Sequence, residues 1–302
     1  MTESDQTIEL MGSSGREEIH IVRSGSGPQR FLVWHGFDSV NRLFPWSFLR
    51  KAGELFRVGL PGHGPVERQS WCHYAGWNSD HFIEIAVAIC KRFFVDAPLT
   101  LVGHSAGAHV ALGAASRVPD VVGRLILISP WLWSPLGALT RRLSGTSIWP
   151  LLGTLAIAPK VWKKRRSIHS FLHGIRSLIG DRESFYSNPN TPRYVSDGLE
   201  DYRRTAIGAL VSAARAFAVC DLRPTLMAAD LSVPTLIVHG EEDPVSPVAQ
   251  SEWLARQLTN ATLIKLPGVG HVAYGERETE FARIVTSWLA SQRPCGLTSA
   301  SS

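Results

Sequence analysis

The sequence predicts an α/β fold, built on a mostly parallel wound sheet with helices on both of its faces. Short apolar runs alternate with amphipathic segments along most of the chain, which is the pattern of strand–helix units. Several apolar runs end in loops that carry Ser, Asp or His, as expected at the carboxyl ends of parallel strands. Apolar residues make up 44% of the 302 residues, which is enough for a sizeable core and excludes a disordered chain.

Two strands are predicted near the start of the chain, at residues 17–24 and 30–34. Between them lies Gly-Ser-Gly-Pro at 25–28, which leads into a strand and not a helix. This segment is therefore predicted to be a hairpin turn and not a phosphate-binding loop. A helix at 43–52 and a strand at 55–58 follow.

A long amphipathic helix is predicted from residue 78 or 79 to residue 94. Asp80 and Glu84 lie near its start, where negative charge suits the helix dipole. The alternation continues with strands at 99–102, 124–128, 234–240 and 262–266, and with surface helices at 250–257 and 276–290.

The pentapeptide Gly-His-Ser-Ala-Gly at residues 103–107 joins the strand at 99–102 to a helical segment. A sharp strand-to-helix turn exposes the serine Oγ above the sheet edge and places the next N–H group at a helix N-terminus. The flanking glycines allow this turn, because a Cβ at either position would crowd the strand and the helix. Ser105 is therefore the candidate nucleophile.

A serine nucleophile needs a base, and the base needs an acid that orients it. Asp243 follows the predicted strand at 234–240, and His271 follows the predicted strand at 262–266. Three alternatives stay open. Asp243 precedes a proline and has an alternative role as a turn residue, Glu241 or Glu242 is an alternative acid, and His271 has an alternative structural role in its loop.

The order Ser, Asp, His resembles that of the α/β-hydrolase superfamily. The resemblance extends from about residue 19 to residue 289 and is weakest between 131 and 220. It implies that Ser105 is the nucleophile, His271 the general base and Asp243 the residue that orients His271. The family's loop after the third strand is matched by His-Gly-Phe at residues 35–37, which implies an oxyanion hole formed by the backbone N–H groups of Phe37 and Ala106.

Four further residues are candidates for substrate binding. His35 and Asp38 flank the implied oxyanion loop, with a turn-shaping role and a solvated carboxylate as the respective alternatives. Trp131 and Trp133 follow the strand at 124–128, and packing against the core is their alternative. His104 adjoins Ser105 on the turn and is not expected to reach back to Oγ.

The strand–helix alternation stops between residues 131 and 225, where aromatic and basic residues gather in helical patterns. The resemblance implies that this insertion is a helical cap roofing the active site, with residues 1–130 and 226–292 forming the core. Residues 293–302 contain Ser and Gly and are predicted to be a disordered tail.

Basic residues recur in the predicted cap at Arg141-Arg142, at Lys-Lys-Arg-Arg (163–166) and at Arg203-Arg204. A solvated helix face is the expected explanation. Contact with an acidic carrier protein, an anionic substrate or membrane headgroups is the alternative. Nucleic-acid binding is not expected, because the net charge is only +5 and no recognition motif accompanies the basic run. The sequence does not predict the oligomeric state.

Several observations bear on location and cofactors. The first residues are polar and acidic without the apolar run of a signal peptide, and no stretch approaches the ~18–20 apolar residues of a membrane span. Cys72, Cys90, Cys220 and Cys295 lack metal-ligand or redox spacing. A cytoplasmic protein with no transmembrane segment, no metal and no organic cofactor is therefore expected.

Together the motifs predict a serine hydrolase that acts on an ester, thioester or lactone of a hydrophobic small molecule. Carbon–carbon bond cleavage, amide cleavage and non-hydrolytic chemistry are alternatives within the superfamily. An accessory small-molecule-binding protein, like those of tetrapyrrole pathways, is the non-enzymatic alternative.

Overall fold

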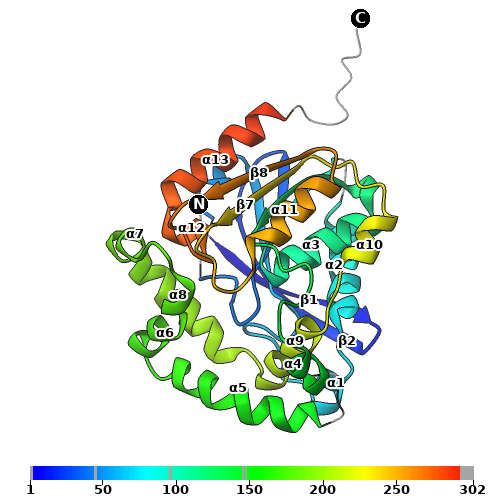
Figure 1. Cartoon of the computed structure of the whole chain (residues 1–302), viewed down its shortest axis with the longest axis vertical. Coiled ribbons are helices and arrows are strands. Elements are labelled where there is room, and N and C mark those ends of the chain that lie inside the picture. The colour runs from blue at the N-terminus through cyan, green and yellow to red at the C-terminus, as the bar shows by residue number, and fades with distance from the viewer. Residues whose placement is uncertain (1–2, 44–45, 95–96, 145, 147, 293–302) are drawn as a thin grey trace, which may run out of the picture.

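A computed structural model describes residues 3–43, 46–94, 97–144, 146 and 148–292 (Figure 1). The strands are β1 (Ser4–Gly12), β2 (Gly15–Gly25), β3 (Gln29–Trp34), β4 (Gly53–Val58), β5 (Leu99–His104), β6 (Val122–Ile128), β7 (Thr235–Gly240) and β8 (Ala261–Leu266). The core helices are α1 (Trp71–Ala75), α2 (Ser79–Phe93), α3 (Ala106–Arg117), α10 (Arg223–Ala228), α11 (Val248–Gln257), α12 (Ala273–Glu276) and α13 (Glu278–Ser291), and the short 3-10 helices are η1 (Leu49–Lys51), η2 (Pro119–Val121) and η3 (Arg176–Leu178).

These strands form one sheet in the order β1-β2-β4-β3-β5-β6-β7-β8. The strands β1, β2 and β4 pair antiparallel in turn, and every pairing from β4–β3 to β7–β8 is parallel. A strand-to-strand parallel connection needs a crossover, and the helices supply these crossovers. The mostly parallel sheet that the alternating sequence pattern predicts is therefore confirmed.

The two faces of the sheet carry separate hydrophobic layers. Along β6, Leu125 and Leu127 face one layer while Ile126 and Ile128 face the other, as the period of two requires. Helices α2 and α3 cover the first face, and α13 covers the second (Figure 1). Because the central parallel strands are buried on both faces, they are mainly apolar, with a few polar residues such as His104 and His239 near their carboxyl ends.

Three features of the N-terminal part differ from the sequence prediction. Residues 25–28 do not form a hairpin turn, because β4 lies between β2 and β3 in the sheet. The true hairpin is β1–β2, and β1 was not predicted. The predicted helix at 43–52 is also wrong: residues 44–45 lie outside the described ranges, and in 46–52 only η1 is helical.

A helical insertion lies between β6 and β7, at the lower edge of the molecule in Figure 1. It contains α4 (Ala138–Ser144), α5 (Trp149–Arg165), α6 (Ile168–Ile175), α7 (Arg182–Ser187), α8 (Thr191–Arg204) and α9 (Ile207–Ala218). Within the described ranges, no helix has both the length and the apolar character needed to cross a membrane. The predicted disordered tail at 293–302, with Cys295, falls outside those ranges, and Cys72, Cys90 and Cys220 are free thiols.

Candidate active site

Ser105 lies at the junction of β5 and α3 with a backbone conformation that L-residues rarely adopt, φ 55° and ψ −117°. The turn is tight because two glycines let neighbouring backbone approach. A Cβ on Gly103 would lie 2.4 Å from the carbonyl oxygen of Gly107, and a Cβ on Gly107 would lie 2.4 Å from that of Trp34. The Ser105 N–H donates to the carbonyl of Ile128 at 2.9 Å. Strain of this kind is retained where the surrounding structure enforces it, most often at functional sites.

Phe37 and Ala106 are close to Ser105 in the fold, since all three line one cavity. Ala106 is the first residue of α3, and the first N–H groups of a helix have no partner within it. Phe37 lies in the loop after β3, followed by Asp38 with a φ of 57°. The two residues with the implied oxyanion-hole N–H groups thus lie beside the serine.

Asp243 and His271 meet between the loops that follow β7 and β8. His271 Nδ1 donates to Asp243 Oδ2 at 2.7 Å, and the side chains are 5% and 1% exposed. The other carboxylate oxygen, Oδ1, accepts from the N–H groups of Val245 at 2.8 Å and Ser246 at 3.0 Å. Since Nδ1 carries the hydrogen, His271 Nε2 is left as the basic nitrogen.

A second histidine contacts the same carboxylate. His239 Nε2 lies 3.2 Å from Asp243 Oδ2. Burial alone would raise the pKa of Asp243, but the hydrogen bonds from His239 and His271 outweigh burial and hold this pKa well below its usual value. The aspartate is therefore ionised. Glu241 and Glu242, the alternative acids, are exposed.

Glu276 fixes the loop that carries His271, and sequence analysis did not single it out. Its carboxylate is buried and accepts four backbone N–H groups, from Gly180 at 2.9 Å, Asp181 at 2.7 Å, Gly270 at 2.9 Å and Val272 at 3.2 Å. Two of these donors belong to the helical insertion and two to the loop around His271. The only sequence signal was a carboxylate five residues after the histidine.

His104 is engaged on both ring nitrogens. Its Nε2 donates to the carbonyl of His271 at 2.9 Å, and its Nδ1 accepts from the Tyr274 hydroxyl at 3.1 Å. Burial, reinforced by the neighbouring His271, lowers the pKa of His104 well below the ordinary histidine value. This ring therefore supports the His271 loop, and both of its nitrogens are engaged by partners other than Ser105.

The cavity over Ser105 has a volume of about 380 Å³ and walls that are mostly apolar. Its walls come from the core and from the insertion: Phe37, Asp38, Ser105, Ala106, Trp131, Leu136, Thr140, Ser144, Trp149, Lys164, Gly174, Leu178, Ala214, Phe217, Ala218, Val245 and His271. Two candidate substrate-binding residues, Trp131 and Asp38, are therefore on the wall.

The other two candidates, His35 and Trp133, do not line this cavity. His35 is buried beneath the loop, where it accepts from the Leu60 N–H at 3.2 Å, and burial lowers its pKa to about 3. Trp133 packs edge-on against Trp253, with the Arg223 guanidinium 4.8 Å from its ring. Both side chains therefore pack within the protein and do not contact the cavity.

Lys164 joins the insertion to the loop beside Phe37, which sequence analysis did not predict. From α5 its ammonium forms an ion pair with Asp38 Oδ2, while the hydroxyl of Tyr202 on α8 donates to Asp38 Oδ1. Of the basic run at 163–166, Lys163 and Arg166 are exposed as a solvated face requires, whereas Lys164 and Arg165 are only partly exposed. The otherwise apolar cavity thus has one charged wall.

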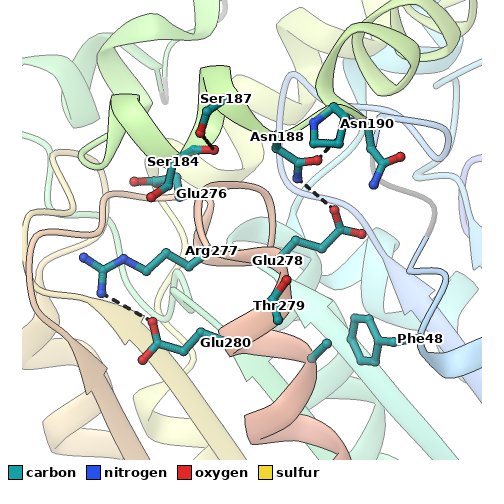
Figure 2. A pocket seen from close by; sticks show the side chains of 12 residues that line it. Phe48, Ser184, Ser187, Asn188, Asn190, Glu276, Arg277, Glu278, Thr279 and Glu280 are labelled. Carbon is teal, nitrogen blue, oxygen red and sulfur yellow. Dashed lines mark hydrogen bonds and ion pairs between the residues drawn. The ribbon is translucent and has the colours of Figure 1, made fainter.

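A second, wider cavity of about 690 Å³ lies between α7, α8 and the start of α13 (Figure 2). Its charged groups are paired with neighbours. Asn188 donates to Glu278 at 2.9 Å, and Arg277 contacts Glu280 at 3.4 Å and Asp181 at 2.8 Å. None of Ser105, Asp243 and His271 lines it. The cavity over Ser105 is therefore the candidate active site. In the described part of the chain, no three His, Cys, Asp or Glu side chains are placed to hold a metal ion.

Residues 31–284 match the model of the alpha/beta hydrolase family, and the chain therefore belongs to this family. Its fold is the α/β-hydrolase fold, and the protein is a hydrolytic enzyme of that class.

Among curated proteins, the chain is similar to the pimeloyl-[acyl-carrier protein] methyl ester esterase of Nitrosomonas europaea, with 22% identity over 85% of this chain and 93% of the relative. It is also similar to the 2-hydroxymuconate semialdehyde hydrolase of a Pseudomonas species, with 26% identity over 93% of both chains. Among solved structures, an esterase from Thermogutta terrifontis superposes with a TM-score of 0.70 and 20% identity, covering 94% of this chain and 98% of the esterase.

Proposed function

We propose that this protein is a serine hydrolase that cleaves an ester, thioester or lactone bond of a hydrophobic small molecule. The observation that carries the proposal is the 2.7 Å hydrogen bond from His271 to Asp243 at the wall of the apolar cavity that also holds Ser105. The esterases among its relatives support the same reaction class.

In the proposed mechanism, Ser105 Oγ attacks the acyl carbon while His271 Nε2 takes the hydroxyl proton. Asp243 keeps the proton of His271 on Nδ1 and stabilises the imidazolium that forms. The N–H groups of Phe37 and Ala106 bind the oxyanion, an interaction worth about 3 kcal/mol for each donor. His271 then protonates the leaving group, and a water molecule activated by the same nitrogen releases the acyl group from Ser105.

The domain assignment belongs to the same proposal. Residues 131–225 act as a cap over a core formed by 1–130 and 226–292, because Leu136, Trp149 and Leu178 of the insertion share the cavity wall with Ser105. An apolar roof of this kind excludes water and favours hydrophobic substrates. A cytoplasmic location remains a prediction from the sequence.

Labelling with a fluorophosphonate probe tests the nucleophile. We expect mass spectrometry to find the phosphonyl group on Ser105, and we expect Ser105→Ala to lose both labelling and ester turnover while keeping its thermal midpoint. Ser116→Ala, on the same helix but outside the cavity, is the matched control. Labelling elsewhere, or turnover by Ser105→Ala within tenfold of the parent, would contradict the proposal. If Ser105 is labelled but the enzyme cleaves a carbon–carbon or amide bond and no ester, the proposed ester hydrolysis would be replaced by that reaction.

A further inference from the structure

The outward face of α5 is apolar. Ile148, just before the helix, is 54% exposed, and Leu151, Leu155 and Trp162 are 64%, 65% and 64% exposed. Their spacing of three, four and seven residues places them on one side of the helix. A surface helix normally turns such a stripe toward the core, but here Gly153 and Val161 are the buried positions. The stripe therefore has no partner within the described part of the chain.

Helix α4 contacts α5 and carries two further exposed leucines. Leu139 is 72% exposed and Leu143 is 39% exposed, and α4 contacts α5 at the edge of the molecule farthest from the sheet strands β7 and β8 (Figure 1). We refer to the following residues as the α4–α5 face: Leu139, Leu143, Ile148, Leu151, Leu155 and Trp162. More than half of the exposed large apolar side chains of the described residues lie between 136 and 168. Large apolar side chains that gather in exposed positions on two neighbouring helices indicate an interaction surface.

The charged residues of α4 and α5 have a single sign. Between Asp120 and Asp181 the sequence contains no Asp or Glu. The exposed basic side chains nearest the stripe in helical register are Lys163 and Arg166 on α5, and α4 carries the exposed Arg141 and Arg142. The Arg166 guanidinium lies 4.8 Å from the ring of Trp162. A helix surface that combines protruding Leu and Trp with Lys and Arg, and has no acidic residues, suits the boundary between lipid headgroups and acyl chains.

We infer that the α4–α5 face docks this protein onto the surface of an anionic lipid bilayer. The aliphatic side chains and Trp162 enter the headgroup region, while the basic residues contact lipid phosphates. A second copy of the chain is a poorer occupant, because a two-fold interface would place the same basic residues opposite one another. The docking does not depend on the proposed chemistry at Ser105, since none of these side chains lines the cavity.

Co-flotation with vesicles tests the inference. The full chain carrying Ser105→Ala is used, so that lipid hydrolysis does not disturb the vesicles. We expect binding to vesicles of equal parts phosphatidylcholine and phosphatidylglycerol, weaker binding to pure phosphatidylcholine, and weakening by added salt. Leu151→Ser and Leu155→Ser should each weaken the partition coefficient about tenfold. Lys163→Gln and Arg166→Gln should each lower it about fivefold.

Matched controls lie on helices outside the face. Met227→Ser removes an apolar side chain that is 73% exposed on α10, and Lys91→Gln removes an exposed charge at the end of α2. Both should bind vesicles like the parent, and every variant should retain the parent's circular dichroism and thermal midpoint. Absence of vesicle binding, or equal losses in the controls, would overturn the inference. So would a concentration-dependent dimer in sedimentation that Leu151→Ser abolishes while vesicle binding persists.

Discussion

Asp243 shares one carboxylate oxygen between two histidines: Oδ2 lies 2.7 Å from His271 Nδ1 and 3.2 Å from His239 Nε2. His239 Nε2 also lies 2.9 Å from the carbonyl oxygen of Ser246, so this nitrogen carries the hydrogen. Its Nδ1 accepts from the Ser251 hydroxyl at 2.6 Å, which fixes the tautomer. His239 is thus a positioning residue that holds Asp243 toward His271.

Replacing His239 tests this positioning role. In His239→Phe, Asp243 loses one charge-assisted hydrogen bond, and we expect kcat for a short soluble ester to fall about tenfold with little change in KM. His239→Gln retains an N–H donor and should recover most of the loss. Ser251→Ala, which frees the tautomer, should produce a smaller decrease in kcat. A parental kcat in a folded His239→Phe protein would show that the contact does not affect the reaction.

Asp243→Asn tests the acid itself. An amide has one oxygen where the carboxylate has two, so it presents either an acceptor or an NH2 donor to His271 Nδ1. When the NH2 group faces this nitrogen, the imidazole loses its reactive tautomer, and kcat should fall by about 10⁴-fold. The side-chain oxygen can still accept from the Val245 and Ser246 N–H groups, so the fold should persist by circular dichroism. The exposed Glu242→Gln is the control. If Asp243→Asn left kcat unchanged while Glu242→Gln lowered it, the acid would be reassigned.

The apolar cavity predicts a preference for longer acyl chains. We expect kcat/KM for a series of esters to rise from acetyl to about hexanoyl or octanoyl, by up to ~0.8 kcal/mol for each buried methylene. Ala214 lines the cavity, and Ala214→Phe should reduce turnover of the long esters while leaving acetyl esters near the parental rate. A flat profile, or one that peaks at acetate, would show that the cavity does not hold the acyl chain.

Buried neutral histidines predict acid lability. Burial lowers the pKa of His35 to about 3 and that of His109 to about 4. Below about pH 6.5 the unfolded chain therefore binds protons that the folded protein excludes, so the free energy of unfolding decreases as the pH falls from 6.5 toward 4. At pH 4 we expect each of the two histidines to lower the free energy of unfolding by roughly 3 kcal/mol relative to its value above pH 6.5.

Urea unfolding at pH 7 and pH 5 measures this effect. His109 Nδ1 donates to the Trp131 carbonyl at 3.0 Å, and His109→Gln can keep a donor there without a titrating ring. The difference in stability between the two pH values should be smaller in His109→Gln than in the parent. The exposed His169→Gln is the matched control. An equal difference in all three proteins would contradict the assignment to His109.

The alternating pattern was sufficient to predict the parallel part of the sheet, because strands buried on both faces are continuous apolar runs. The same pattern was not sufficient to predict which strands pair. The segment at 25–28 resembles a hairpin turn, but the pairing partners of a strand depend on the whole sheet. The edge strand β1 carried a usable signal, the alternation of exposed Thr7 and Glu9 with the buried Ile8. At 43–52, the proline at position 45 was a signal against the predicted helix.

For the candidate site, the local motif around Ser105 and the strand-end positions of Asp243 and His271 were visible in the sequence. Supporting contacts were not, because they join residues far apart in the chain. Glu276 accepts N–H groups from positions near 180, and His239 resembles any other residue in an apolar strand. The apolar residues of the insertion were expected to face the active site. Trp149 does line the cavity, but the expectation is wrong for Leu151 and Leu155, which face outward.

The ion pair between Lys164 and Asp38 couples the position of α5 to the conformation of the loop after β3. Lys164 belongs to the insertion, and Asp38 follows Phe37, whose N–H belongs to the proposed oxyanion hole. Movement of α5 away from the core would have to break this pair and release the loop, so admission of a ligand and preorganisation of the loop are thermodynamically linked. Because such coupling is reciprocal, a ligand that orders the loop also stabilises the closed position of α5, and the coupling free energy is the same in both directions.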